Sequence, residues 1–372
     1  MFSCGNSETT QTEQKPETAP KVVESKQVDT PWNQFRGNAQ NTGASSSKVN
    51  REGLNLMWKV KANARISTSP STGFGMVFFG AADSVFYAVN VQTGDIVWEF
   101  KTKGDIRSNP YIDDKGVYFG SSDGNFYAFD VKTGEKQWIF NTPDMIMSSP
   151  KVLGDYVYFG SYDGKFYALD RNTGKLAWSF KTGDAVYSSP AIFGDVIVFG
   201  SMDHYLYVLN NKTGELKWKF NAKDGVGSSP AILDGVVYFG CDNRAMYALN
   251  LETGKEVWAK PFVCSAPINS SPAVDSKRVY FGSYDYRFYA LNVRTGEKEW
   301  EYTTEQVIHS SPAISNGLAI FGSDDDNIYA LDVVTGEKVW SYLAEDRVHT
   351  SPAVCKGMVF VASFDGYLYA LK

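Results

Sequence analysis

The sequence is poor in the residues on which most catalytic and metal sites depend. Only three histidines and four cysteines occur among its 372 residues, and no two cysteines are adjacent. The chain shows no nucleophile beside a partner base, no phosphate-binding glycine loop and no close pair of carboxylates. We therefore predict that the protein is not an enzyme.

The sequence also lacks excess basic charge, long apolar runs and amphipathic helices. It carries 36 Lys and Arg against 42 Asp and Glu, a net charge of −6. An acidic chain without a basic stripe argues against nucleic-acid binding, and no stretch is apolar for long enough to indicate a transmembrane helix. Without helical periodicity in its repeats, the chain is predicted to be all-β.

Repetition is what the sequence has in abundance, and tryptophan marks it. Eight of its nine tryptophans follow one another at intervals of 40 residues, with a single interval of 42. A unit of this length cannot bury a core alone, and stacked units of about forty residues with short strands are typical of propellers. We expect the indoles to be buried between neighbouring units. They are Trp58, Trp98, Trp138, Trp178, Trp218, Trp258, Trp300 and Trp340.

One repeat shows how each unit is built. Residues 157–159 and 166–169 are β-branched and aromatic runs, and the Asp163-Gly164 pair between them favours a two-residue hairpin turn. Asp170 then begins a slightly longer hairpin loop into a last strand, which carries the tryptophan. With a short strand ahead of these three, each unit is predicted to be a four-stranded antiparallel blade.

The number of Ser-Pro and Asn-Pro pairs gives the number of blades. Each unit has one Ser-Pro or Asn-Pro pair, and proline cannot donate to a β-ladder, so this segment is predicted to be the short innermost strand. The fold class is then an eight-bladed β-propeller around a central channel. The eight prolines are Pro70, Pro110, Pro150, Pro190, Pro230, Pro272, Pro312 and Pro352.

The two ends of the chain complement each other. The last unit stops at Lys372 after three strands, whereas residues 54–60 form a fourth strand with no others before it. We expect this N-terminal strand to complete the last blade and close the ring. The predicted organisation is a disordered tether at 1–30, an entry segment at 31–53 and a single propeller domain at 54–372.

The tether begins near a cysteine. Residues 5–30 are polar and contain no aromatic residue, which predicts disorder. Cys4, followed by a glycine and this tether, resembles the mature start of a bacterial lipoprotein, although the charged and apolar parts of a signal peptide do not precede it. Cys4 is thus a candidate for lipid attachment, with an unmodified thiol as the alternative. Lipidation predicts an extracytoplasmic location in the cell envelope, periplasmic or anchored to the outer membrane.

The other cysteines allow one disulfide. Cys241 ends a strand of blade five, and Cys264 lies in the connection to blade six, the only connection with two extra residues. Both are expected on the same face, so a Cys241–Cys264 bond is a hypothesis that suits an oxidising compartment. The alternative is two separate thiols. Cys355 is predicted to be a small buried hydrophobic residue.

Positions that break the repeat are the candidates for function. One set, the inner ring, directly precedes the Ser-Ser-Pro motif or its equivalent in each unit: Ser67, Arg107, Met147, Tyr187, Gly227, Asn269, His309 and His349. A second set, the turn ring, replaces the glycine of the two-residue hairpin: Ser84, His204, Arg244, Tyr286 and Asp326. Because positive φ is costly for these residues, their presence calls for a reason. Both rings are predicted on one face.

From these rings we predict a partner-binding surface, against the alternative that the side chains vary only because they are solvated. The predicted contact residues are Arg107, Met147, Tyr187, Asn269, His309, His349, His204, Arg244, Tyr286 and Asp326. No metal site is predicted, because His309 and His349 lack a third ligand at a zinc-like spacing and neighbouring inner strands diverge. The acidic run 324–327 is expected to be a solvated turn and not a calcium site.

Two segments resemble a known family. Residues 128–138 match an AxDxxTGxxxW docking motif, which recurs in seven units, and residues 32–43 match a WxxFRGxxxxTG entry motif. Both resemble the quinoprotein propellers, which are built like pyrroloquinoline quinone (PQQ) dehydrogenases. The resemblance covers most of the chain and implies eight blades, with each tryptophan docked on the next blade.

The resemblance leaves two branches open. The enzyme branch implies PQQ, calcium, a vicinal disulfide and a much longer chain; the BamB branch implies a lipoprotein that binds protein partners and no quinone. The unadorned blades, tether and Cys4 favour the second branch. We therefore expect a non-catalytic, monomeric, protein-binding scaffold without a cofactor. A third alternative is carbohydrate or cell-wall binding through Tyr162, Tyr187, Tyr284 and Tyr286.

Overall fold

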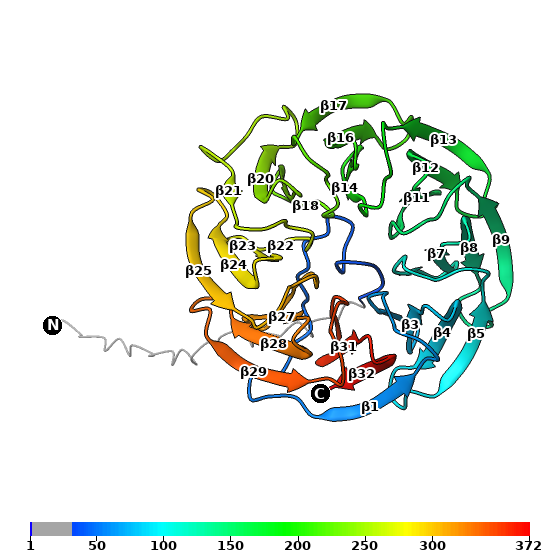
Figure 1. Cartoon of the computed structure of the whole chain (residues 1–372), viewed down its shortest axis with the longest axis horizontal. Helices are drawn as coiled ribbons and strands as arrows, with labels where there is room; N and C mark the ends of the chain where they lie inside the picture. Colours follow the sequence, from blue (N-terminus) through cyan, green and yellow to red (C-terminus); the bar gives the residue numbers. More distant parts are fainter. Residues whose placement is uncertain (2–31) are drawn as a thin grey trace.

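Eight four-stranded antiparallel sheets form a ring around a central bore in the computed structural model (Figure 1). The structure describes Met1 and residues 32–372, so the predicted tether and Cys4 lie outside the described residues. Within the described part of the chain, regular structure is entirely β, which confirms the predicted fold class. This part contains no helix long and apolar enough to cross a membrane.

Each blade has strands A to D, counted from the bore outward. Blades one to four are formed by β2 (Ser71–Gly73), β3 (Met76–Gly80), β4 (Val85–Asn90), β5 (Ile96–Lys101); β6 (Tyr111–Ile112), β7 (Val117–Gly120), β8 (Asn125–Phe129), β9 (Lys136–Asn141); β10 (Lys151–Leu153), β11 (Tyr156–Gly160), β12 (Lys165–Asp170), β13 (Leu176–Lys181); and β14 (Ala191–Phe193), β15 (Val196–Gly200), β16 (Tyr205–Asn210), β17 (Leu216–Asn221).

Blades five to eight follow the same order. They are formed by β18 (Ala231–Leu233), β19 (Val236–Gly240), β20 (Ala245–Asn250), β21 (Phe262–Val263); β22 (Ala273–Val274), β23 (Arg278–Gly282), β24 (Arg287–Asn292), β25 (Lys298–Thr303); β26 (Ala313–Ser315), β27 (Leu318–Gly322), β28 (Asn327–Asp332), β29 (Lys338–Leu343); and β30 (Ala353–Cys355), β31 (Met358–Ala362), β32 (Tyr367–Leu371) with β1 (Leu56–Lys61) as strand D.

The ring closes as the sequence predicts. β1 pairs antiparallel with β32, so the N-terminal strand is the outermost strand of blade eight, beside the C-terminus in Figure 1. Backbone hydrogen bonds in both directions between Asn55 and Lys372, at 2.8 and 2.9 Å, extend the pairing to the last residue. Pairing removes the edge that each strand would otherwise expose.

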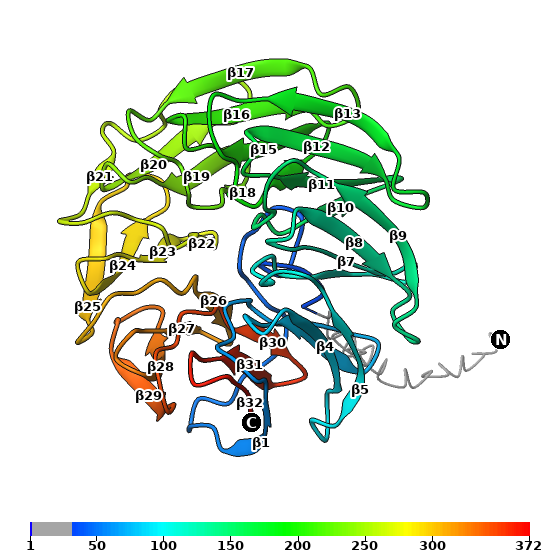
Figure 2. The same cartoon turned by 45° about the vertical axis from the view of Figure 1, so that its right-hand side comes forward.

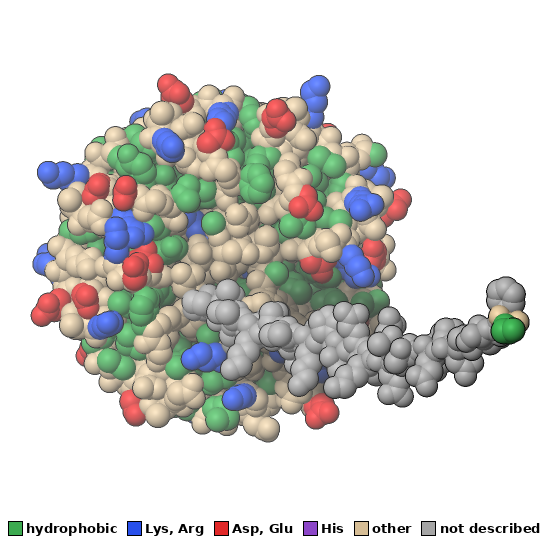
Figure 3. All heavy atoms as spheres, turned by 180° about the vertical axis from the view of Figure 1, so that it is seen from behind, with side chains coloured by type: hydrophobic (Ala, Val, Ile, Leu, Met, Phe, Trp, Pro, Cys, Tyr) green, Lys and Arg blue, Asp and Glu red, His purple; other side chains and the backbone are tan. Residues whose placement is uncertain are grey.

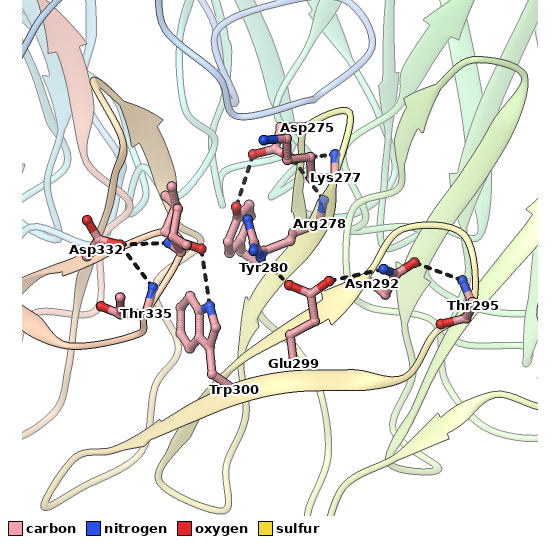
Figure 4. Close-up of polar contacts among 12 residues, drawn as sticks. Asp275, Lys277, Arg278, Tyr280, Asn292, Thr295, Glu299, Trp300, Asp332 and Thr335 are labelled. Atoms are coloured by element: carbon pink, nitrogen blue, oxygen red, sulfur yellow. Dashed lines mark hydrogen bonds and ion pairs between the residues drawn. The ribbon is translucent and has the colours of Figure 1, made fainter.

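Tryptophans dock on the next blade, and Figure 4 shows one example. Nε1–H of Trp300 in β25 donates to the Val333 carbonyl of blade seven at 3.1 Å. The Asp332 carboxylate shapes the turn beneath the indole by accepting from the Val334 and Thr335 amides. Equivalent Nε1 bonds cross five more seams, from Trp58, Trp98, Trp138, Trp218 and Trp258. The docking implied by the AxDxxTGxxxW motif is thus confirmed.

The two-residue insertion interrupts one outer strand. In blade five, strand D is reduced to the two residues of β21, directly after Pro261, which has no N–H to give to a ladder. Trp258 still donates to the Val293 carbonyl at 3.0 Å. The insertion therefore disturbs the edge of the blade and leaves its docking contact in place.

Serines around the bore form a closed belt of hydrogen bonds, which explains the Ser-Pro repeat. In each blade the residue before proline donates its amide to the side chain of the corresponding residue in the next blade, as Ser189 does to Ser229 Oγ at 2.9 Å. The belt closes where Ser351 donates to Ser69 Oγ at 2.9 Å. Its members are Ser69, Asn109, Ser149, Ser189, Ser229, Ser271, Ser311 and Ser351.

The entry segment lies inside the ring, where the blue trace crosses the centre of Figures 1 and 2. Its carbonyls accept hydrogen bonds from strand A amides of six blades, at 2.7 to 2.9 Å, so the free inner edges of those strands are paired. The donor and acceptor pairs are Thr72 to Trp32, Ile112 to Asn33, Ile192 to Ala39, Ile232 to Gln40, Val274 to Thr42 and Ile314 to Gly43.

Two buried cations anchor this segment. Lys151 Nζ donates to Gln34 Oε1 at 3.1 Å and to the Phe35 and Asn38 carbonyls at 2.6 and 2.8 Å. Arg36 donates to the Pro312 carbonyl on the other side of the ring. Burial lowers the pKa of Arg36 to about 9 and that of Lys151 well below its usual value. Residues 32–43 are therefore an integral part of the ring's interior.

The bore consequently has two different ends. The turns between strands B and C surround one end, which we call the turn face. The hairpins between strands A and B surround the other, the hairpin face. Residues 47–49 of the entry segment bond to hairpin residues such as Ser315, Asn316 and Gly357.

Candidate functional site

The inner ring surrounds the bore at the turn face. The residues two positions before each inner-ring residue are hydrogen-bonded to the B–C turns. For example, the Ser122 amide donates to the Asp105 carbonyl, and the Tyr162 amide donates to the Met145 carbonyl. Every member of the ring is half-buried. The side chains are thus held by the scaffold and still reach solvent, as a binding surface requires.

The turn ring has the backbone conformation that its sequence position predicts. The φ angles of Ser84, His204, Arg244, Tyr286 and Asp326 lie between 67° and 77°. These residues end the B–C turns, next to strand C, and so lie farther from the bore than the inner ring. The structure puts both rings on the turn face, but the turn-ring side chains leave from separate blades.

A third set of variable positions was not recognised from the sequence as a set, although Tyr162, Tyr284 and the acidic run 324–327 were noted separately. Each member follows the small residue that comes directly after strand B. The larger members contact inner-ring residues, as Tyr162, Tyr284 and Phe364 do. The signal was available, because this position varies between constant neighbours. We call the set the seam set: Ala82, Ser122, Tyr162, Met202, Asp242, Tyr284, Asp324 and Phe364.

One side of the turn face is aromatic and acidic. The Tyr162 and Tyr187 rings stack with centroids 5.9 Å apart, and a Cβ at Gly227 would overlap the Tyr187 hydroxyl, so glycine leaves room for it. Burial raises the pKa of Asp242, assisted by the Asp224 carboxylate, and the Oδ1 atom of Asp242 has no hydrogen-bond partner. This part of the site combines a flat apolar surface with hydrogen-bonding groups.

On the cationic side, Arg107 lies 3.6 Å from the carboxylate of Asp105, and both side chains are more than a third exposed. Such an exposed pair contributes little to stability. Its guanidinium therefore remains accessible to a ligand. Met147 is half-buried in the next blade.

The opposite side of the turn face gathers two histidines. Asn269 donates to the Tyr284 hydroxyl at 3.0 Å, and the Tyr284 ring lies 4.4 Å from that of His309. The His309 and His349 rings are 3.6 Å apart, centroid to centroid. Three predicted contact positions, Asn269, His309 and His349, and the seam residue Tyr284 thus lie in a continuous arc.

The expectation that these histidines lack a third ligand is wrong. Asp324, from the B–C turn of blade seven, has Oδ2 3.7 Å from His309 Nε2 and Oδ1 3.3 Å from His349 Nε2. The inner strands do not diverge enough at this level to separate the two imidazoles. The residues that could hold a metal are therefore His309, His349 and Asp324, with ligand atoms within 4.8 Å of one another.

The hypothesis of a Cys241–Cys264 disulfide is also wrong, because both are separate thiols. Cys241 packs against the end of blade four, with Sγ 3.3 Å from the Gly225 carbonyl, whereas Cys264 packs against blade six. The two sulfurs thus occupy different seams. Burial raises the pKa of Cys241 to about 11 and that of Cys264 to about 12, so both are protonated at neutral pH. Cys355 is buried, as predicted.

Outside the turn face, the surface has fewer features that indicate a binding site. In Figure 3 acidic and basic side chains intermingle around the rim, with hydrophobic groups between them. A groove of about 430 Å³ lies between the A–B hairpins of blades four and five, lined in part by Phe193, Lys217 and Trp218. It lies over the seam between these two blades, beside the docked indole of Trp218.

Comparisons with solved structures agree with this architecture. BamB from Moraxella catarrhalis is 19% identical, with a TM-score of 0.74, and the match covers 86% of this chain and 99% of that one. A europium-containing methanol dehydrogenase is 15% identical over 92% and 98% of the two chains, with a TM-score of 0.81. The computationally designed protein Ika8 is 18% identical over 86% and 99%, with a TM-score of 0.76. At these identities the similarity shows the fold alone.

The sequence comparison is more specific. A search of curated proteins finds no significant match. The family model described as outer membrane protein assembly factor BamB, in contrast, matches residues 46–185, 203–313 and 304–372. These matches take in most of the ring and every one of its eight blades in whole or in part. The chain therefore belongs to the BamB family of PQQ-like propellers.

Proposed function

We propose that this chain is a non-catalytic, protein-binding propeller of the bacterial cell envelope that assists the assembly of outer-membrane proteins. One observation carries the proposal: the inner-ring and seam-set side chains, which differ from blade to blade, gather around the bore on the turn face. Family membership supports the same reading, since the family is described by outer-membrane assembly. Fold alone would not, because one fold hosts many functions.

The chemistry of the turn face suits a protein partner. Tyr, Arg and Met are enriched at the cores of protein interfaces, and Tyr162, Tyr187, Arg107 and Met147 lie on neighbouring blades. The stacked tyrosines are rigid before binding, which lowers the entropy lost on association. The partner would offer apolar side chains to the tyrosines and hydrogen-bonding groups to Asp242 and Asn269.

The function would need no quinone. The entry segment already pairs with the inner edges of strand A in six blades and so occupies part of the bore. The similarity to a methanol dehydrogenase, at 15% identity, supports a common fold and gives no support for a shared cofactor. We also propose that the protein acts as a monomer outside the cytoplasmic membrane, with lipid on Cys4 as the anchor.

Photo-crosslinking in living cells tests the binding surface. A photoreactive phenylalanine analogue is placed at Tyr162 or Tyr187 on the turn face, and at Leu153 or Phe193 on exposed A–B hairpins as matched controls. We expect crosslinks to outer-membrane assembly proteins from the first two positions alone. Crosslinks confined to Leu153 and Phe193 would refute the assignment.

A second experiment tests the absence of quinone chemistry. PQQ and Ca²⁺ are added to the purified protein, and the melting temperature and dye reduction in the presence of an alcohol are measured. A ligand at a hundred times its Kd stabilises a protein by about 2.7 kcal/mol. We expect no stabilisation and no turnover, whereas both together would establish the dehydrogenase alternative.

A third experiment tests the lipid anchor. Cys4→Ser should release the protein from the membrane fraction if Cys4 is the anchor.

A further inference from the structure

Three side chains with metal-binding atoms converge on the turn face at the seam between blades seven and eight. They are His309, Asp324 and His349, contributed by the segments that lead into strand A of two blades and by the B–C turn between them. All three are half-buried. We propose that they bind a divalent transition-metal ion, with Zn²⁺ as the best-matched ion.

The repeat supplies an internal comparison. Each seam contains the same three positions: an inner-ring residue, a seam-set residue and the inner-ring residue of the next blade. Among the eight seams of the described ring, the seam between blades seven and eight alone fills all three with metal-ligating side chains. The corresponding seam between blades three and four holds Met147, Tyr162 and Tyr187. The ligand set is thus a property of this seam and not of the scaffold.

Distances between the ligand atoms suit one shared ion. Atoms bound to zinc at about 2.0–2.1 Å in a tetrahedron lie roughly 3.3 Å apart. The His349 Nε2 to Asp324 Oδ1 distance is 3.3 Å, and the His309 Nε2 to Asp324 Oδ2 distance is 3.7 Å. Two histidines and one carboxylate leave a fourth position for water or for a group from a partner.

Metal binding requires the two imidazole rings to move apart. The imidazole centroids are 3.6 Å apart, whereas rings that share a tetrahedral ion are separated by roughly 5 Å. The His309 and His349 side chains are 25% and 28% exposed, so each can move toward solvent. Tyr284 and Phe364, 4.4 and 4.6 Å from the two rings, flank the pair and limit its movement.

Electrostatics favour a cation between these groups. Asp324 Oδ1 is buried without a hydrogen-bond partner. Asp325, Asp326 and Asp346 lie close by and outnumber the two nearby cations, Arg347 and Arg65, so the site has a negative potential.

Metal titration of the full-length protein tests the proposal, and the chain provides its own control. The protein is stripped with EDTA and titrated with Zn²⁺ by calorimetry and with Co²⁺ by visible absorption. The variants are His309→Ala, His349→Ala and the isosteric Asp324→Asn. His204→Ala removes the chain's one other histidine, which lies on a B–C turn of blade four, and serves as the matched control. Thermal melts establish that each variant folds.

We expect one Zn²⁺ per chain, a Co²⁺ d–d absorption band, and unchanged binding in His204→Ala. Each ligand substitution should weaken binding at least tenfold and abolish the Co²⁺ band, including in Asp324→Asn, which changes no volume. The proposal is overturned if the protein binds no stoichiometric metal, or if binding survives in the His309→Ala/His349→Ala double variant. The outcome does not depend on whether the proposed protein partner exists.

Discussion

The two ends of the bore use the same eight-fold repeat in opposite ways. Toward the hairpin face, residues 32–49 pair with the inner strands through backbone carbonyls and two buried cations. At the turn face the inner edge carries side chains that change from blade to blade. The contrast shows that a propeller can assign structural closure to one end and recognition to the other.

Unpaired polar atoms sharpen the contrast. Toward the hairpin face they include atoms of Arg36 and Asn41, which are fully enclosed in the ring. At the turn face they include the Oδ1 atoms of Asp242, Asn269 and Asp285, which are half-buried. An unpaired buried polar atom costs about 1–3 kcal/mol. A ligand at the turn face would recover part of this energy.

The largest expected effect comes from breaking closure, on which both ends depend. Deletion of residues 54–61 removes β1 and the docked indole of Trp58. Burying one indole is worth about 5 kcal/mol, and about 2–4 °C is lost per kcal/mol, so Tm should fall by roughly 10–20 °C in scanning calorimetry. An unchanged Tm would show that the ring does not need its N-terminal strand.

Lys151→Met should disturb the hairpin end selectively. It leaves the Phe35 and Asn38 carbonyls and Gln34 Oε1 without their buried donor, at a cost of about 3 kcal/mol. Chemical denaturation measures the loss, and faster proteolysis within residues 32–43 should accompany it. Lys175→Met, at an exposed position, is the control and should change stability by less than about 0.5 kcal/mol. Equal stability of the two variants would mean that Lys151 does not hold the segment.

A single link of the serine belt is worth less. Ser229→Ala leaves the buried Ser189 amide without an acceptor and should destabilise the protein by about 1–3 kcal/mol, measured by urea denaturation. Ser122→Ala, a turn-face serine outside the belt, should have almost no effect. If the two substitutions cost the same, the belt contributes nothing specific.

The smallest effect is expected in the turn ring. The φ angle of Arg244 is 73°, a value that glycine adopts without steric cost and other residues do not. Arg244→Gly should therefore stabilise the protein by up to about 1 kcal/mol. The reverse change at the same position of blade three, Gly164→Ala, should destabilise it by about the same amount. Opposite shifts in Tm confirm that the turn ring keeps strained residues for their side chains; a loss in both variants would contradict this.

The fold could be predicted almost completely, because its determinants recur. The tryptophan and proline intervals count the blades, and Lys372 and residues 54–60 reveal the incomplete blade that the N-terminal strand fills. The course of the entry segment could not be predicted in the same way. It occurs once, so no period describes it, and its carbonyls bond to amides that are far away in the sequence.

The candidate site was predicted only in part, for a related reason. The inner ring interrupts a repeat and is visible in the sequence, whereas contacts across a seam join residues a blade apart. Asp324 is 15 residues after His309 and 25 before His349, unlike the short spacings of local metal motifs. The wrong disulfide has the same origin, because Cys241 and Cys264 flank one blade yet face different seams.

Complementation by two matched variants tests the division between the ends most directly. One variant carries Arg107→Ala, Tyr162→Ala and Tyr187→Ala on the turn face; the other carries Phe74→Ser, Leu153→Ser and Phe193→Ser on exposed A–B hairpins. Each replaces the wild-type gene in its host, with folding checked by thermal melts. Our account predicts that outer-membrane protein levels fall only with the turn-face variant. A defect confined to the hairpin-face variant would contradict it.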